Sequence, residues 1–222
     1  MAFMEMFKPD PKKFWDFRSN PIIRALTVSD IFLISSFGLI TPIFAVFLTQ
    51  NIRGGNLQVA GFASTIYLLT KSLGQIPIAR IADKIKGERD DFWMMVIGSF
   101  ATSLIPILYL IATRPLDIYL IQFFYGLSQA FIFPSWMAIF TRHIDREKES
   151  TQWGFYCTLT DLFSALAAGT GGLIAYRLGF KPLFILVSIL SFIGSAWLLL
   201  VKNQLRKKGG LLSKITFPLR KN

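Results

Sequence analysis

The sequence predicts an all-α membrane protein with six transmembrane helices. Of its 222 residues, 53% are hydrophobic and only 17% are charged, whereas about a quarter of a soluble domain is charged. The charged residues are also segregated, because most of them lie between long apolar runs. These features argue against a soluble enzyme, a nucleic-acid-binding domain and a disordered chain.

The apolar runs define the six helices. A helix needs about 20 apolar residues to cross a bilayer, and a barrel strand needs only about 10. Four runs within the spans are free of charge over that length, and two more are interrupted only by Lys71 or Asp161. We therefore expect an N-terminal segment, a six-helix domain and a basic tail, over residues 1–24, 25–202 and 203–222. The expected helices are 25–50, 57–79, 92–113, 117–141, 151–177 and 181–202.

The orientation follows from the basic residues. The chain carries 24 Lys+Arg against 13 Asp+Glu, a net charge of +11. Most Lys and Arg lie in the N-terminal segment, the second-to-third and fourth-to-fifth connections, and the tail. The positive-inside rule then places both termini in the cytoplasm. We expect a multi-pass protein of the plasma membrane whose basic charge needs no nucleic-acid partner.

Three charged residues lie within the expected helices. A charge at the centre of a bilayer costs about 2.5–3.5 kcal/mol on insertion scales, so each position needs a reason. Asp30 and Lys71 lie at similar depth, which makes an ion pair between them geometrically possible. Asp161 lies near the middle of the fifth helix, with no cation three or four residues away. A carboxyl at this depth is what a proton-coupled carrier needs.

Two helices carry a polar and aromatic face at helical spacing. Such faces line a wet cavity or bond to neighbouring helices. The fourth helix presents Gln122, Tyr125, Gln129 and Trp136. The second helix presents Ser64, Tyr67, Lys71 and Gln75.

The fifth helix carries a stripe of small residues that would let another backbone approach closely. Packing within the bundle and a subunit interface both explain the stripe. It comprises Gly154, Thr158, Asp161, Ala165, Ala168 and Gly172.

Few residues are suited to catalysis or cofactor binding. The single Cys157 cannot form an internal disulfide, and the single His143, expected in an exposed loop, cannot form a His-rich metal site. The sequence contains no glycine-rich phosphate loop, metal-ligand spacing or nucleophilic dyad. We therefore expect no enzyme activity, cofactor or metal.

Several segments resemble one half of a major facilitator superfamily transporter. The segment 79–84, with Gly87 and Arg89, is similar to the signature cytoplasmic loop of the family, although Ala79 stands where glycine is usual. Gln122 stands where many proton antiporters of the family have arginine, so that subgroup is not supported. Further similar segments are 41–44, 51–60, 125–127 with Pro134, 145–149, 171–173 and 179–184.

The resemblance implies a fold and a function. The family's usual fold has twelve helices in two halves, each built from a three-plus-three repeat, and this chain matches one half. Two parallel copies would rebuild the whole as a homodimer. The first and fourth helices would line the cavity, and the second and fifth would form gates against the partner. Asp30, Lys71, Gln122, Tyr125, Gln129 and Asp161 would lie along the pathway for substrate and ion.

The same resemblance assigns a gating loop. Its residues would be Asp83, Lys84, Gly87 and Arg89, with Asp83 meeting the start of the partner's fifth helix. The implied function is secondary active transport of a small solute by alternating access. Two alternatives stay open: a non-transporting membrane subunit or scaffold, and one half of a split transporter that needs a different second half.

Overall fold

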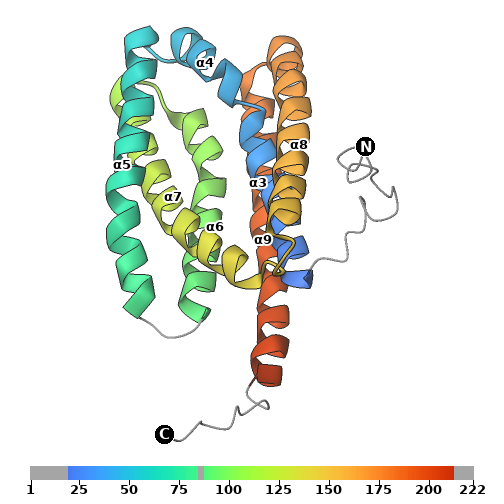
Figure 1. Cartoon of the computed structure of the whole chain (residues 1–222). Coiled ribbons are helices and arrows are strands. Elements are labelled where there is room, and N and C mark those ends of the chain that lie inside the picture. The colour runs from blue at the N-terminus through green and yellow to red at the C-terminus, as the bar shows by residue number, and fades with distance from the viewer. Residues whose placement is uncertain (1–19, 85–87, 213–222) are drawn as a thin grey trace, which may run out of the picture.

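The computed structural model describes residues 20–84 and 88–212, and every regular element in those ranges is helical. A short 3₁₀ turn, η1, lies between the first two helices (Figure 1). The elements are α3 (Pro21–Gly38), η1 (Thr41–Ile43), α4 (Phe44–Asn51), α5 (Leu57–Lys84), α6 (Arg89–Ile111), α7 (Pro115–His143), α8 (Glu149–Leu178) and α9 (Phe180–Leu212).

Five segments of the described chain are long and apolar enough to cross a membrane: Pro21–Asn51, Arg89–Ile111, Pro115–His143, Glu149–Leu178 and Phe180–Lys202. The sixth expected span, 57–79, falls on α5, which has 28 residues but is not among these five. Its apolar residues alternate with Ser, Thr, Gln and Lys, which lowers its mean hydropathy. The expectation of six apolar spans therefore holds for five by length and composition.

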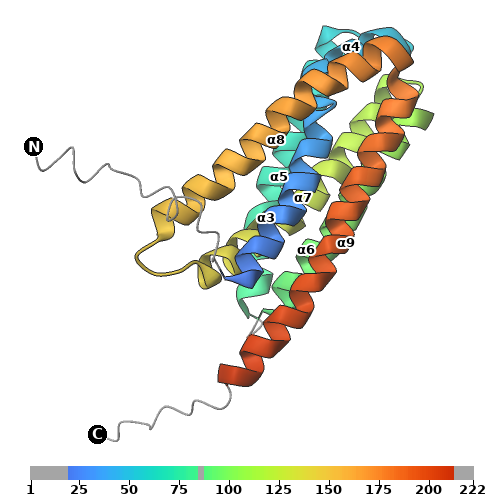
Figure 2. The same cartoon turned by 90° about the vertical axis from the view of Figure 1, so that its right-hand side faces the viewer.

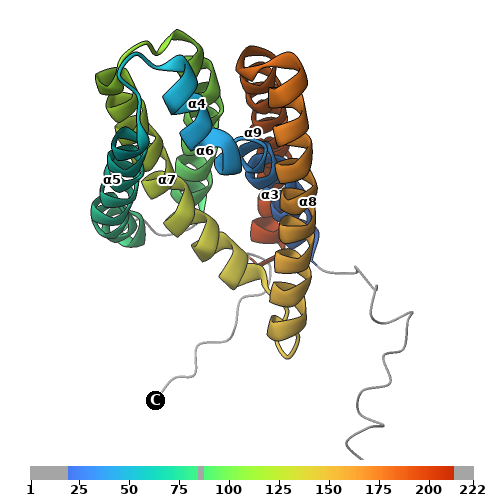
Figure 3. The same ribbon diagram turned by 90° about the horizontal axis from the view of Figure 1, so that it is seen from above.

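The helices form two groups that are joined mainly where α6 packs on α9. In Figures 1 and 3, α5, α6 and α7 lie on one side, α3, α8 and α9 lie on the other, and α4 lies near the upper end. Helix α5 packs on α7, α3 packs on both α8 and α9, and α6 packs on α7 and α9. Figure 2 shows α8 and α9 diverging toward the lower end. This arrangement leaves the region between α3–α8 and α5–α7 free to hold a pocket.

The first expected helix, 25–50, is broken in the structure. Helix α3 ends at Gly38, and the chain passes through η1, which contains Pro42, before α4 begins. Proline lacks the N–H that a continuous helix needs. The Thr41 hydroxyl donates a hydrogen bond to the Phe37 carbonyl at 2.8 Å, which satisfies one of the carbonyls released by the break.

Buried serines join the two groups where α6, α9 and α3 meet. The hydroxyls of Ser103 and Ser195 lie 2.9 Å apart, and Ser188 donates to the Ser103 carbonyl at 2.6 Å. Ser29 donates to the carbonyl of Gly194 at 2.8 Å. All three contacts pair buried polar groups, so this side of the bundle is internally satisfied. Large apolar side chains fill clusters at the upper and lower ends.

The outward faces of the helices differ in chemistry. Residues 93–111 of α6 and 183–200 of α9 expose only apolar side chains, such as Ile97 and Ile189. By contrast, α5 exposes Ser64 and Thr65, and α8 exposes Asp161 with several small and hydroxyl residues. The first kind of face suits contact with lipid. On the second, the Ser64 and Thr65 hydroxyls donate to carbonyls of their own helix at 3.1 and 3.0 Å, so Asp161 is the group that hydrocarbon would not satisfy.

A single residue connects α8 to α9. Gly179 has φ of +83°, a backbone conformation that residues with a Cβ rarely adopt, and its N–H donates to the Ala175 carbonyl at 3.0 Å. Helix α9 then continues to Leu212, ten residues beyond its expected end, so the predicted tail begins as helix. The remainder of that tail, 213–222, and residues 1–19 of the predicted N-terminal segment lie outside the described residues.

Candidate functional site

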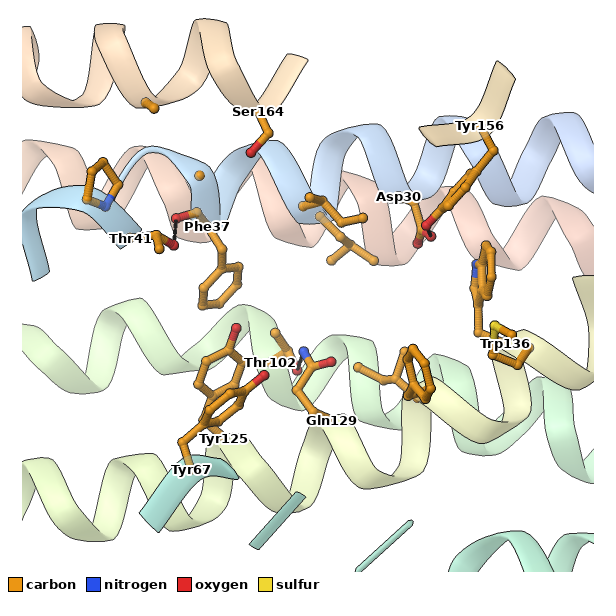
Figure 4. A pocket seen from close by; sticks show the side chains of 18 of the residues that line it. Asp30, Phe37, Thr41, Tyr67, Thr102, Tyr125, Gln129, Trp136, Tyr156 and Ser164 are labelled. Atoms are coloured by element: carbon orange, nitrogen blue, oxygen red, sulfur yellow. Dashed lines mark hydrogen bonds between the residues drawn. The ribbon is translucent and has the colours of Figure 1, made fainter. Parts of the chain in front are cut away.

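A pocket of about 690 Å³ lies between α3 and α8 on one side and α5 and α7 on the other (Figure 4). This volume falls within the range of about 300–1,000 Å³ that is typical of small-molecule sites. The lining is mostly apolar and aromatic, with one acidic residue and no basic residue. It consists of Asp30, Leu33, Ile34, Phe37, Gly38, Thr41, Pro42, Tyr67, Thr102, Tyr125, Gln129, Ile132, Phe133, Trp136, Met137, Trp153, Tyr156, Ser164 and Ala168.

One end of the pocket is formed by a carboxylate among aromatic rings. Asp30 on α3 is buried, and its Oδ2 accepts a hydrogen bond from the Tyr156 hydroxyl on α8 at 2.7 Å. The ring centroids of Trp136 and Tyr156 are 5.0 Å apart, and those of Trp136 and Trp153 are 6.0 Å apart. Figure 4 shows Asp30, Tyr156 and Trp136 together at this end.

A stack of three aromatic rings forms the other end. Tyr125 lies between Phe37 and Tyr67, with centroid distances of 5.0 and 4.6 Å and nearly parallel planes. Between the two ends, the Gln129 Nε2 atom donates to the Thr102 hydroxyl at 3.5 Å. The pocket therefore pairs a polar end with a long aromatic wall and has few hydrogen-bonding groups in between.

The six pathway residues expected from the sequence are divided by the structure. Asp30, Tyr125 and Gln129 line the pocket. Gln122 is buried on α7 outside the lining, and its Oε1 has no hydrogen-bond partner in the described chain. Asp161 lies on the exposed face of α8, and Lys71 is half-buried on α5. Three of the six expected pathway residues therefore line the pocket.

The structure contains no Asp30–Lys71 ion pair, although it describes both residues. The Lys71 Nζ atom lies 4.9 Å from the centroid of the Phe133 ring, a cation–π contact between α5 and α7. Asp30 instead bonds to Tyr156, as described above. Similar depth in the membrane did not bring the two charges together because α5 packs on α7 whereas α3 packs on α8 and α9.

A second polar cluster lies at the lower end of the bundle. Arg142 on α7 donates to the buried Asp91 of α6 at 2.5 Å. His143, expected in an exposed loop, is instead buried in the last turn of α7. Its Nδ1 atom lies 2.9 Å from the Ile139 carbonyl and 3.6 Å from Glu88 Oε1. The helix runs two residues past its expected end at 141, which draws this histidine inside.

The expected gating loop lies beside this cluster. Asp83 and Lys84 are exposed in the last turn of α5, and Arg89 is exposed at the first residue of α6. Gly87 lies outside the described residues. Within one chain, Asp83, Lys84 and Arg89 are therefore exposed to solvent.

Sequence reasoning missed the contribution of α8 to the pocket. Trp153 and Tyr156 are three residues apart and so share one face of the helix. That spacing is typical of an aromatic face, but we assigned a role to this helix from its stripe of small residues instead. No group of three or more His, Cys, Asp or Glu side chains that could hold a metal occurs among the described residues.

Fold and pocket together define a class. Apolar helices that surround a pocket lined from six elements are the architecture of a multi-pass membrane protein that handles small molecules. A family comparison matches residues 26–221 to the Major Facilitator Superfamily, and the chain belongs to that family. Members of this family are transporters rather than enzymes, and their substrates are small molecules. A comparison with curated proteins found no match.

Proposed function

We propose that the protein is a six-helix unit of a secondary active transporter, and that two parallel copies pair around their pockets and move a small solute by alternating access. The observation that carries this proposal is the exposed Asp161 on the small-residue face of α8. A charge left in hydrocarbon costs about 2.5–3.5 kcal/mol on insertion scales, so this face of α8 needs a protein or aqueous neighbour at membrane depth.

The face of α8 has the properties of an interface. A Cβ added at Gly154, Gly169 or Gly172 would meet nothing within 4 Å, so the small residues on this face are not covered by the chain itself. Small residues permit close helix contact in membranes. This supports the second of the two explanations for the stripe, a subunit interface, over packing within the bundle. Asp161 on the same face would then lie between subunits, where we place the proton-coupled step.

The three-plus-three repeat is supported by two similar helix crossings. At the α3–α8 crossing, a Cβ on Gly38 would lie 2.8 Å from the Ser164 hydroxyl. At the α5–α7 crossing, a Cβ on Gly126 would lie 2.6 Å from the Tyr67 carbonyl. If α3 corresponds to α7 and α5 to α8, these are the same contact in the two repeats. In this arrangement α5 crosses the membrane as the sixth span, shielded from lipid by α7 and the partner.

The orientation that we propose places the lower end of the bundle in the cytoplasm of the cell. The start of α3, the ends of α5 and α6 that flank the second-to-third connection, the connection 144–148 and the end of α9 lie at this end, and most of the Lys and Arg flank or follow these points in the sequence. Asp83 would contact the N-terminus of the partner's α8, near Thr151, where free backbone N–H groups favour a carboxylate. This contact closes the cytoplasmic side and breaks when the pocket opens there.

Cysteine cross-linking tests the pairing. In a chain with Cys157→Ser, the substitutions Asp83→Cys and Thr151→Cys should give cross-linked dimers in native membranes. The matched control places cysteines at Ile97 and Ile189 on the lipid-facing side, and these should not cross-link.

Each of the other outcomes contradicts the homodimer or supports one of the two alternatives. Monomers by single-molecule photobleaching would refute the homodimer, and recovery of cross-links only with a second, different chain would indicate a split transporter. Dimers that carry no solute across a vesicle membrane would indicate the scaffold alternative.

A further inference from the structure

The carboxylate of Asp30 lacks a cationic partner. It is 8% exposed, and Tyr156 supplies its one hydrogen bond among the described residues. No ion pair to Asp30 exists within that part of the chain, and no Lys, Arg or His lines the pocket. Removing an unpaired charge from water is unfavourable, so the charged form of the Asp30 carboxyl is stabilised when a positive charge lies beside it.

The surroundings of Asp30 are suited to an organic cation. Trp136, Trp153 and Tyr156 form a cluster with centroid distances of 5.0–6.0 Å. The faces of tryptophan and tyrosine rings attract cations, most strongly where water is excluded, and such clusters recognise quaternary ammonium groups.

Trp136, which lines this end of the pocket, carries an unpaired polar group. The indole N–H of Trp136 is buried and donates to no acceptor in the described chain, and the residue is only 5% exposed. An unpaired buried donor costs about 1–3 kcal/mol.

The remainder of the pocket specifies the body of the ligand. From Asp30 the lining continues along apolar side chains to the Phe37–Tyr125–Tyr67 stack. Only Gln129, Thr102, Thr41 and Ser164 offer non-aromatic polar groups along it, which is too few to replace the hydration of a sugar or a peptide. The volume of about 690 Å³ admits a ligand of drug size.

We propose that this pocket binds a monovalent organic cation with an aromatic or branched apolar body. Its charge lies beside Asp30 within the Trp136–Trp153–Tyr156 cluster, and its body lies along the aromatic stack. The inference rests on the proposed transport function and names the substrate class for the same site. Anions are disfavoured because the only charged group in the lining is negative.

Two probes of matched size and opposite charge test the proposal: radiolabelled tetraphenylphosphonium and tetraphenylborate, with the full chain in lipid nanodiscs and empty nanodiscs as background. Saturable binding of the phosphonium without saturable binding of the borate is expected. Asp30→Asn should weaken phosphonium binding by about tenfold or more. Glu149→Gln, which removes an exposed acidic group outside the pocket, should leave it unchanged.

A second matched pair of variants tests the role of the aromatic cluster. Trp136→Leu should weaken binding by about three- to tenfold, whereas Trp197→Leu on the lipid-facing side of α9 should have no effect. Equal binding of both probes to the wild-type chain would overturn the proposal without any variant. So would unchanged phosphonium affinity in a folded Asp30→Asn chain. Loss of cation binding alongside intact cross-linked dimers would refute the substrate class only, and binding by a chain that never dimerises would refute only the pairing.

Discussion

Two helix crossings in this molecule use the same glycine contact and differ in what lies about two turns away. Gly38 and Gly171 allow α3 and α8 to touch, and Gly126 and Gly74 allow α7 and α5 to touch. Eight residues before Gly38 stands Asp30, whereas eight residues before Gly126 stands Ile118. Close backbone approach is therefore common to both crossings, but the buried carboxylate belongs to one.

The same difference holds on the partner helices. Fifteen residues before Gly171 stands Tyr156, which bonds to Asp30, and fifteen residues before Gly74 stands Val59. Ile118 and Val59 are both buried. Apolar side chains therefore fill the corresponding positions of the α5–α7 crossing. Helix packing alone does not call for a carboxylate–phenol pair, which favours a role for that pair in binding.

The largest change in stability is expected from a substitution at Gly171, where α8 contacts α3. A Cβ there would overlap the backbone of Leu39, which cannot move aside as a side chain can. Gly171→Ala should lower stability by about 3 kcal/mol, at the upper end of overpacking effects. Thermal unfolding in detergent should show a drop of about 2–4 °C for each kcal/mol.

The control for this experiment is Gly169→Ala on the same helix, where an added Cβ meets nothing within 4 Å. Its unfolding temperature should stay close to wild type. Gly74→Ala should fall between the two, because its nearest obstacle is the methyl group of Ala130. Equal unfolding temperatures for all three variants would mean that the crossings are not tight contacts.

The next largest change in stability is expected when the hydrogen bond between Tyr156 and Asp30 is removed. Tyr156→Phe removes the donor that the Asp30 carboxylate uses, so the folded chain should lose about 1–3 kcal/mol. The double substitution Asp30→Ile with Tyr156→Val copies the other crossing and should recover that stability, because well-packed apolar residues often replace buried polar pairs without loss. The same double variant should lose phosphonium binding. Retained binding, or a double variant less stable than Tyr156→Phe, would show that the pair is structural.

The smallest effect is expected for the cation–π contact between Lys71 on α5 and Phe133 on α7. Lys71→Met and Phe133→Leu should show a coupling energy of about 0.5–1 kcal/mol in a double-mutant cycle, the size of a partly exposed cation–π contact. Lys71 and Asp30 should show none, because their side chains contact different helices. A coupling between Lys71 and Asp30 that exceeds the Lys71–Phe133 coupling would restore the ion pair expected from sequence.

The apolar runs predicted the helices well because bilayer thickness fixes their length. They could not predict the break at Pro42, since proline is tolerated within membrane helices. They also could not show that α9 continues to Leu212, because a helix beyond the apolar run carries no hydropathy signal.

Helical spacing also indicated a cavity-facing side for α7, where Tyr125 and Gln129 line the pocket. It could not choose which helix meets which. The partner of Asp30 therefore came from α8 rather than α5, and the outward position of Asp161 matches one of the two explanations that the sequence left open for the small-residue stripe. Spacing along one helix defines a face, but the identity of the facing helix is a property of the whole bundle.

The one-residue link at Gly179 has a mechanical consequence. It ties the upper end of α8 to α9, and Gly171 holds α8 against α3 about two turns below the link. The lower end is joined to α7 by the longer connection 144–148. At 1.5 Å per residue, Tyr156 lies about 35 Å from Gly179. A small tilt of α8 about its upper end would therefore move Tyr156 away from Asp30 much farther than it moves residues beside the link.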